Sequence, residues 1–210
     1  MREIKPYKDE NGMMTAVDNG GRVFDLFSKS GDRVISEGEL AKAAGAVTAG
    51  VYAYLFFDMA CQDLPEEARQ RAVEALEPEL RKTYQENRSR ITTPSQMGQE
   101  PTLGRGVIIE GYARPLEDPY AKNARTNVTV SAGGGTGYEK VPLVKRYDVF
   151  ELFDNEGMKG GKAIAAVDRG TGLATGKKVR LGGILEKLFY QEKDPQRPRI
   201  FLDTLFYTWL

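Results

Sequence analysis

The sequence contains no histidine, and Cys61 is its only cysteine. The missing histidine excludes Ser-His-Asp and Cys-His catalytic arrangements, because both need an imidazole as the base. Zinc sites built from cysteine and histidine are excluded as well, because one cysteine and no histidine cannot supply their ligands. A single cysteine allows no disulfide within the chain. Cys61 lies in an apolar run, which favours a buried, unreactive thiol.

The chain also lacks net charge, because 30 Lys and Arg balance 30 Asp and Glu among its 210 residues. This balance argues against a strongly basic nucleic-acid-binding protein. The two halves differ slightly: residues 1–103 hold 13 basic and 17 acidic side chains, and residues 104–210 hold 17 and 13. Opposite net charges would help the two halves to dock.

No apolar run is long enough for a membrane span. The uncharged stretch from Ala43 to Phe57 has 15 residues, whereas a bilayer requires about 20. We therefore predict a central buried helix here and no membrane span. The N-terminal residues are polar and show no apolar signal-peptide core, so as written the chain is expected to be cytoplasmic.

The first 88 residues are predicted to be a helical region. A short helix is expected at Arg22–Phe27, and a second helix begins near Glu37 and continues into the apolar stretch. A third runs from Leu64 towards Asn87, and Pro78 would kink or divide it. Asp63 precedes this helix as a possible N-cap.

Residues 22–44 have the spacing of helix, twelve-residue loop and helix. A calcium loop supplies oxygen ligands from positions 1, 3, 5, 7, 9 and 12. Counted from Ser28, these positions are Ser28, Ser30, Asp32, Val34 (through its carbonyl), Ser36 and Glu39. The apolar Ile35 falls at position 8. The stretch therefore resembles the EF-hand family, and the resemblance implies a calcium site.

The ligand set departs from the family pattern. Serine replaces the first acid, and Arg33 stands where the family has a glycine for the sharp turn. Only Asp32 and Glu39 are anionic ligands. Since ligand charge sets calcium affinity, we expect a vestigial loop with no cofactor, or calcium binding in roughly the millimolar range. A similar run at 149–157 lacks the later ligands and is interpreted as a strand entering a turn.

The second half predicts strands rather than helices. Residues 89–103 are polar with two prolines and are predicted to be a linker. Within 104–210, six strand-like segments alternate with glycine-rich turns, and a small antiparallel barrel would remove their edges. The segments starting at Gly104 and Gly176 both read Gly-x-x-Val-x-x-x-Gly, which resembles OB-fold barrels. The predicted fold class is α+β: an N-terminal helical segment with an EF-hand-like hairpin, then an OB-like β barrel.

Three patterns in this half were weighed as sites. The glycine runs 133–137 and 172–178 lack the P-loop sequence and are interpreted as hairpin turns. Aromatic and basic residues interleave, as in barrels that stack single-stranded bases: Tyr147, Phe150, Phe153, Phe189 and Tyr190 with Lys145, Arg146, Lys178, Arg180 and Lys187. An acid–base pair could come from Asp148, Glu151, Asp154, Glu156 and Asp168.

No catalytic residue emerges from these patterns. We predict a non-catalytic binding or structural assembly protein that engages a protein partner or self-associates. The alternatives are a single-stranded nucleic-acid-binding OB module and a hydrolase using acidic residues. A basic aromatic groove would favour the first alternative, and a carboxylate cleft would favour the second. If the structure shows neither feature, the non-catalytic assembly protein is favoured.

Overall fold

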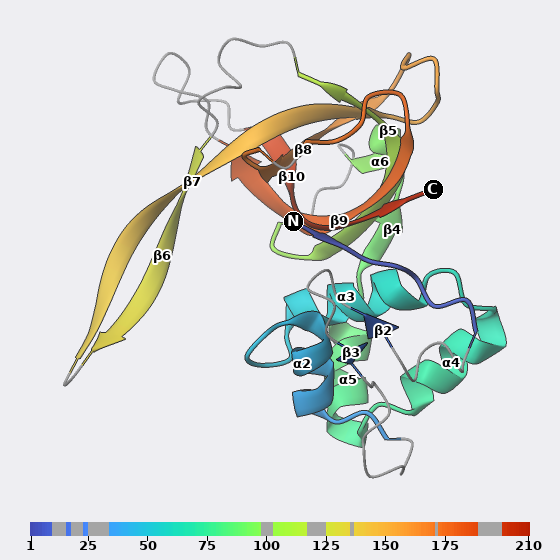
Figure 1. The fold of residues 1–210 in the computed structure, drawn as a ribbon, viewed down its shortest axis with the longest axis vertical. Coiled ribbons are helices and arrows are strands. Elements are labelled where there is room, and N and C mark those ends of the chain that lie inside the picture. Colours follow the sequence, from blue (N-terminus) through green and yellow to red (C-terminus); the bar gives the residue numbers. More distant parts are fainter. Residues whose placement is uncertain are drawn as a thin grey trace.

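The computed structural model describes residues 1–9, 16–17, 23–24, 34–97, 103–116, 125–134, 137–170, 172–188 and 199–210. Helices form one half of the molecule and a closed barrel forms the other, with a long two-stranded arm extending from the barrel (Figure 1). The predicted α+β class is therefore confirmed.

The helical half contains α2 (Glu37–Ala44), α3 (Val51–Cys61), α4 (Glu66–Glu74) and α5 (Pro78–Asn87). Pro78 divides the predicted third helix as expected, because proline at the first helical position loses no hydrogen bond. The predicted second helix is shorter than expected. It ends at Ala44, where Gly45 adopts a left-handed conformation with φ 76°, and α3 begins anew at Val51.

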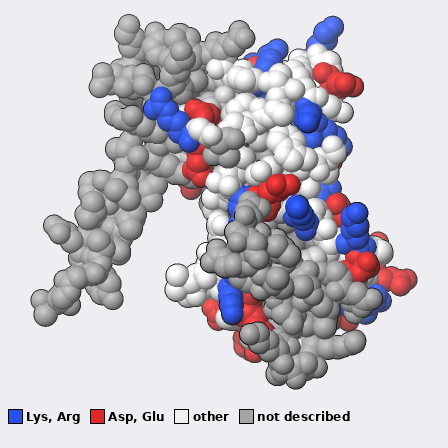
Figure 2. Space-filling view, in the orientation of Figure 1, with Lys and Arg blue, Asp and Glu red and all other residues white. Residues whose placement is uncertain are grey.

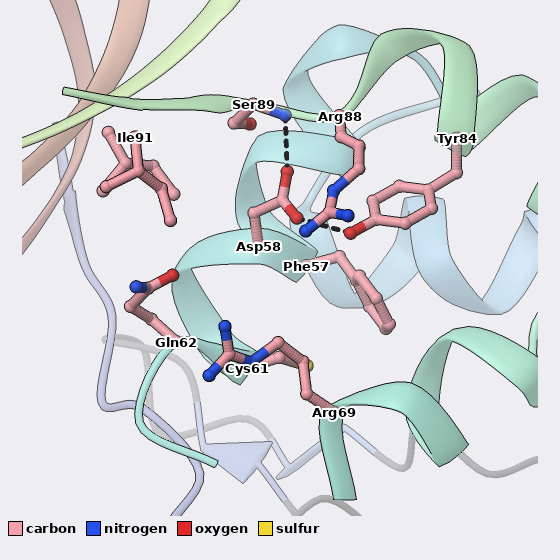
Figure 3. A pocket seen from close by; sticks show the side chains of 10 residues that line it. Phe57, Asp58, Cys61, Gln62, Arg69, Tyr84, Arg88, Ser89 and Ile91 are labelled. Carbon is pink, nitrogen blue, oxygen red and sulfur yellow. Dashed lines mark hydrogen bonds between the residues drawn. The ribbon is translucent and has the colours of Figure 1, made fainter. Parts of the chain in front are cut away.

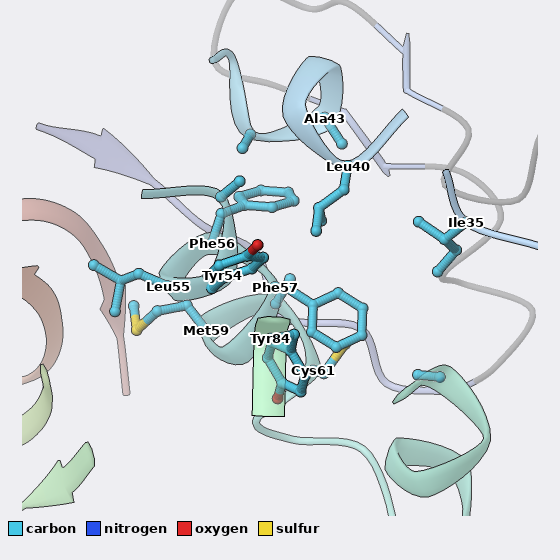
Figure 4. Packing of buried hydrophobic residues seen from close by; sticks show 14 of the residues in the cluster. Ile35, Leu40, Ala43, Tyr54, Leu55, Phe56, Phe57, Met59, Cys61 and Tyr84 are labelled. Atoms are coloured by element: carbon cyan, nitrogen blue, oxygen red, sulfur yellow. The ribbon is translucent and has the colours of Figure 1, made fainter. Parts of the chain in front are cut away.

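Helix α3 lies at the centre of the larger core (Figure 4). Leu55, Phe57 and Met59 are almost fully buried, as are most residues of this helix. The same core includes Ile108 and Phe206 from the barrel. The core of the helical half therefore extends onto the barrel, while most buried apolar residues of the barrel form separate clusters.

The barrel consists of β5 (Gly106–Pro115), β7 (Gly137–Phe153), β8 (Lys162–Asp168), β9 (Lys178–Leu188) and β10 (Arg199–Trp209). It closes in the order β5-β7-β8-β10-β9-β5. Neighbouring strands are antiparallel except β8 and β10, which are parallel. The OB-like barrel is thus confirmed, with the correction that it is mixed rather than wholly antiparallel.

The arm combines β6 (Arg125–Gly134) with the first part of β7, residues 137–146. A proline inside a strand favours a break, but β7 continues through Pro142. Pro142 lies opposite Thr129 in the two-stranded arm. An edge strand has a neighbour on one side only. It tolerates proline because the N–H that proline lacks can be one that faces away from that neighbour.

Two further strands extend the sheet beyond the barrel. β1 (Arg2–Glu3) pairs in parallel with β10, and β4 (Arg90–Thr92) pairs in parallel with β5. The short helix α6 (Pro94–Met97) follows, with Met97 in the barrel core. Part of the predicted linker at 89–103 is therefore folded, while the division into domains stays a prediction.

A small sheet of β2 (Ala16–Val17) and β3 (Val23–Phe24) corrects the predicted helix at Arg22–Phe27, because Val23 and Phe24 lie in a strand. The remainder of that prediction falls outside the described residues. Among the helices that the structure describes, none has the length and apolar character needed to cross a bilayer.

Gly182 and Gly183 of β9 lie opposite a register shift in β10, between Thr204 and Phe206. A Cβ on Gly183 would lie 2.3 Å from the Asp203 carbonyl oxygen. A Cβ on Gly182 would lie 3.0 Å from Met59 Cγ. The missing side chains therefore allow β10 and α3 to approach β9 closely.

Candidate functional site

The expected calcium loop is described only at its end. Ser28, Ser30 and Asp32 lie outside the described residues. Val34 is described and is exposed. Ser36 and Glu39 lie at the start of α2 and form a capping box. The Ser36 backbone N–H donates to Glu39 Oε2 at 2.9 Å, and the Glu39 N–H donates to Ser36 Oγ at 3.3 Å. These two predicted ligands therefore cap the helix.

Ile35 is fully buried and anchors the start of α2. Its N–H donates to the Ala75 carbonyl at 2.7 Å, and its carbonyl accepts from the Glu77 N–H at 3.0 Å. It forms a parallel bridge to Leu76, so its pairing is with the α4–α5 connection. Within the described ranges, no cluster of three or more potential metal-ligating side chains is found.

The five acids considered for a hydrolase each have a separate environment. Asp148 accepts a hydrogen bond from the Gly170 N–H at 2.7 Å, and Asp154 accepts one from the Ser95 N–H at 3.2 Å. Asp168 accepts one from the Met1 amino group at 2.6 Å. Glu151 forms ion pairs with Arg114 and Lys162, and Glu156 is exposed. Burial raises the pKa of Glu151, but the hydrogen bonds from Arg114 and Lys162 outweigh it and lower the pKa below the ordinary value. An ionised, paired carboxylate is a poor general acid.

A small polar cavity lies where α3, α4, α5 and β4 meet (Figure 3). Its volume of about 20 Å³ has room for about one water molecule. Asp58 lines it and accepts hydrogen bonds from the Tyr84 hydroxyl at 2.5 Å and the Ser89 N–H at 2.8 Å. A space this small holds no organic substrate, so the cavity is a structural junction between the helices.

Burial raises the pKa of Asp58, and the hydrogen bonds from Tyr84 and Ser89 offset only part of this effect. Burial also raises the pKa of Cys61, with the nearby Asp58 charge adding to it. A neutral, buried thiol is neither a nucleophile nor a metal ligand. Cys61 is thus inert, as the sequence predicted. In the sequence, the sign of this buried cluster was one acid, Asp58, at the end of an apolar run.

Arg180 links the helical half to the barrel. Its Nε donates to Glu110 Oε1 at 2.8 Å, and its Nη1 donates to Asp63 Oδ1 at 2.8 Å. Burial raises the pKa of Glu110, but hydrogen bonds from Lys178 and Arg180 outweigh it and lower the pKa. Asp63 is therefore an ion-pair partner, whereas Pro65 occupies the N-cap of α4.

The predicted aromatic and basic residues form no open groove in the part of the chain that is described. Tyr147 packs on Phe201 with 5.6 Å between ring centroids, and its hydroxyl donates to Asp203 at 3.1 Å. Phe150 and Phe153 are buried. The three aromatic residues of β7 whose side chains are described are thus all buried, and β8 contains no aromatic residue.

The molecular face in Figure 2 supports this conclusion. Lys and Arg lie interspersed with Asp and Glu over its described residues, with uncharged surface between them. No continuous basic stretch crosses the described part of this face. Among the other predicted residues of the groove, Phe189 and Tyr190 lie outside the described residues, and the structure does not describe the side chains of Lys145, Arg146 and Lys187.

The sequence predicted a hairpin turn at the glycine run 133–137 with strands on both sides, and β6 and β7 pair there as the two strands of the arm. The ten paired positions run from Arg125 opposite Arg146 to Gly134 opposite Gly137. In the described part of the chain, β6 pairs with β7 alone. At 17 residues, β7 is longer than most strands in globular proteins.

No protein-family model matches the chain, and no curated protein matches it in sequence. Its possible function must therefore be inferred from its own geometry.

Proposed function

We propose that the chain is a non-catalytic assembly protein whose β6–β7 arm connects it to a protein partner. The arm carries this proposal because a two-stranded hairpin is at best marginally stable alone in water. Here it extends over ten paired positions away from the barrel (Figure 1). A long ribbon of this kind gains stability by packing against another molecule.

The sequence of the arm agrees with a binding role. Val128 pairs with Leu143, and Val130 pairs with Val141, so the middle of both strands is apolar in sequence.

The catalytic alternative has less support. The five acids weighed for a hydrolase have separate partners or surroundings. The cavity beside Asp58 accommodates about one water molecule. Neither these acids nor this cavity brings two carboxylates to the two sides of a substrate.

Single-stranded nucleic acid is a second candidate partner because the arm strands are basic. They contain Arg125, Lys140, Lys145 and Arg146 against one acid, Glu139. Arg125 lies opposite Arg146, which concentrates positive charge at the base of the arm. Backbone phosphates would bind such a cluster, with affinity that falls as salt rises.

The test is an armless variant in which residues 127–144 are replaced by Asn-Gly. This two-residue turn joins Thr126 to Lys145, which are already opposite each other. Light scattering of the full chain should give a mass above 23.3 kDa, and the armless variant should return to the monomer mass with an unchanged melting temperature. A monomeric full chain, or an oligomer that survives removal of the arm, would overturn the proposal. Arm-dependent, salt-sensitive binding of a labelled oligonucleotide by a monomer would favour the nucleic-acid role.

We further propose that the EF-hand-like loop at 28–39 has no calcium-dependent role, because Ser36 and Glu39 already cap α2. Calorimetric titration of EDTA-stripped protein should give no heat at millimolar calcium. Glu39→Gln is the matched variant, since glutamine can keep the capping box while removing the charged ligand. Heat that disappears in this variant would establish a working calcium site.

A further inference from the structure

Asp58 connects helix α3 to the chain on its way from α5 to the barrel. Its Oδ1 accepts from the Tyr84 hydroxyl of α5 at 2.5 Å, and its Oδ2 accepts from the Ser89 N–H at 2.8 Å (Figure 3). Ser89 directly precedes β4, which pairs with the barrel strand β5. One carboxyl therefore joins α3, α5 and the start of β4, and these three residues form what we call the Asp58 junction.

The Ser89 side chain is a third polar group beside this carboxyl. Its Oγ is buried and has no hydrogen-bond partner elsewhere in the described residues. A protonated carboxyl can donate to this oxygen while it accepts from the Tyr84 hydroxyl and from the Ser89 N–H. The neutral form of Asp58 therefore fits all three neighbouring groups.

The charged and titratable groups around Asp58 give its ionised form only partial support. From α5, Arg88 lies beside it, but this residue is exposed, so water screens its charge. From α4, Arg69 lines the same cavity, and its Nη2 donates to a backbone carbonyl. On α3 itself, the Cys61 thiol stays neutral because burial raises its pKa. Burial raises the pKa of Asp58 as well, and the hydrogen bonds and the Arg88 charge offset only part of that rise.

An ionised Asp58 needs more water than the closed cavity holds. The cavity has a volume of about 20 Å³, which is room for about one water molecule. The walls contributed by β4 and β5 are the apolar side chains of Ile91 and Ile108. A carboxylate in such surroundings is destabilised by the loss of its hydration. It recovers that hydration when the walls separate.

We propose that the Asp58 junction is a pH-sensitive switch between the helical half and β4. The protonated carboxyl holds α3, α5 and the start of β4 together. Its ionisation opens the junction locally, while the helices and the barrel stay folded, and gives solvent access to Cys61 and to the apolar side chains that line the cavity. The switch does not involve the arm, so the behaviour of the armless variant does not bear on it.

The direction of the pH effect depends on which form holds the proton more tightly. In the closed junction burial raises the pKa of Asp58, whereas in the open junction the hydrated carboxyl returns to a pKa of about 3.9. Between these two values the ratio of open to closed molecules should rise by at most about tenfold per pH unit, because one proton is involved. Below this range the junction is closed, and above it the ratio levels off.

Cys61 is a natural reporter of the opening, since it is the only cysteine of the chain, is 1% exposed and lines the same cavity. The experiment measures its labelling by 4,4′-dithiodipyridine in the full chain between about pH 4 and pH 8. Each rate is divided by the rate of the urea-unfolded chain at the same pH, which removes the pH dependence of the thiol itself. This relative rate should rise with pH by at least about tenfold in total. It should change little in low urea, because a local opening exposes little surface.

Three variants sharpen the measurement. Asp58→Asn removes the titrating group and keeps a polar side chain of the same shape, so its relative rate should stay low at every pH. Glu67→Gln is the matched control, because Glu67 is an exposed acid in the first turn of α4, and it should follow the wild type. Arg88→Gln removes the charge that favours ionisation of Asp58, so the rise should be larger and should extend to higher pH.

Two results would overturn the switch directly: a relative rate that does not change with pH in the wild type, or a pH dependence that persists in Asp58→Asn. Labelling that accelerates in urea as steeply as global unfolding would also overturn it, because Cys61 would then be reached only through complete unfolding. If Asp58→Asn does not fold, Arg88→Gln decides. An extended pH range supports the switch, and an unchanged range overturns it.

Discussion

The body of the molecule, meaning its helices and closed barrel, differs from the arm in the range of its contacts. In the body, Phe206 of β10 packs against Tyr52 and Phe56 of α3, with ring centroids 4.7 and 6.1 Å apart. In the arm, all ten pairs come from one hairpin. The body is therefore stabilised by segments distant in sequence, whereas the arm depends on local pairing and on any partner it binds.

Arg2 shows how closely the body is connected. Its guanidinium donates to the Ala43 carbonyl at 3.0 Å, in the last turn of α2. The same group lies over the rings of Phe56 and Phe206, 4.9 and 5.4 Å from their centroids. A cation at a helix C-terminus and on aromatic faces is favourable in both settings. One side chain thus contacts a strand and two helices.

The largest expected effect is the loss of the last strand. Removing residues 206–210 deletes Phe206, which belongs to the core of the helical half, and one end of β10. Truncation of a buried phenylalanine alone costs about 3–5 kcal/mol. Circular dichroism should show no cooperative thermal unfolding for this variant, while removal of the exposed Leu210 alone should leave the transition in place. A normal melting temperature after the larger deletion would contradict the extension of this core onto the barrel.

The next largest effect is expected at Gly183. A Cβ there would lie 2.3 Å from the Asp203 carbonyl oxygen, which belongs to the strand backbone. Gly183→Ala should therefore lower the free energy of unfolding by about 1–3 kcal/mol, as overpacked core positions do. Urea denaturation measures this change.

Gly38→Ala is the control for that substitution. Gly38 lies within α2, and a Cβ there meets nothing within 4 Å. Alanine should raise the free energy of unfolding by about 0.5–1 kcal/mol, because glycine is unfavourable in a helix. Equal effects of the two substitutions would argue against a close approach of β10 to β9.

Asp58 should make stability depend on pH. Burial raises its pKa in the folded protein, so the folded state holds this proton more tightly than the unfolded chain does. Its contribution is fully present below the unfolded pKa of about 3.9 and is lost as pH rises through the folded pKa. Asp58→Asn should flatten this part of the pH profile in denaturant titrations. A profile identical to that of the wild type would contradict the assignment.

Asp58→Leu separates hydrogen bonding from charge at the same position. It would leave the Tyr84 hydroxyl and the Ser89 N–H without their acceptor. An unsatisfied buried polar group costs about 1–3 kcal/mol. Asparagine can accept from Ser89 and donate to Tyr84, so Asp58→Asn should retain more stability at neutral pH than Asp58→Leu.

The smallest effect on the body is expected from the armless variant. Replacement of residues 127–144 by Asn-Gly removes paired positions of the two-stranded arm and leaves the barrel pairings of β7 in place. The free energy of unfolding per monomer should change by less than about 1 kcal/mol, measured at concentrations where the full chain is monomeric. A large loss would mean that the arm contributes to the fold of the body.

Local signals in the sequence predicted most strands and one helix boundary. Glycine-rich turns marked the strand ends, and Pro78 divided α4 from α5 because its effect requires no distant contact. The left-handed Gly45 that ends α2 was missed, since an apolar run continues past it. The parallel pairing of β8 with β10 could not be predicted from the sequence, because order in a sheet depends on contacts between distant segments.

The calcium-loop pattern shows the limit of an argument from spacing. Positions 9 and 12 of such a loop are three residues apart, and so are the two residues of a capping box. Ser36 and Glu39 satisfy both patterns, and the structure uses them to cap α2. The sequence could not distinguish the two uses, because both need oxygen atoms at the same separation beside a helix.

The position of Phe206 in the helical core also constrains the order of folding. The helices precede the barrel in the chain, yet their core includes a residue from β10. A chain made from its N-terminus can form α2 to α5 early, but Tyr52 and Phe56 lack their aromatic neighbour until β10 is synthesised. Long-range contacts of this kind slow folding and leave apolar surface exposed in the meantime. The helical half of the nascent chain therefore keeps part of its apolar surface uncovered until the last strand is made.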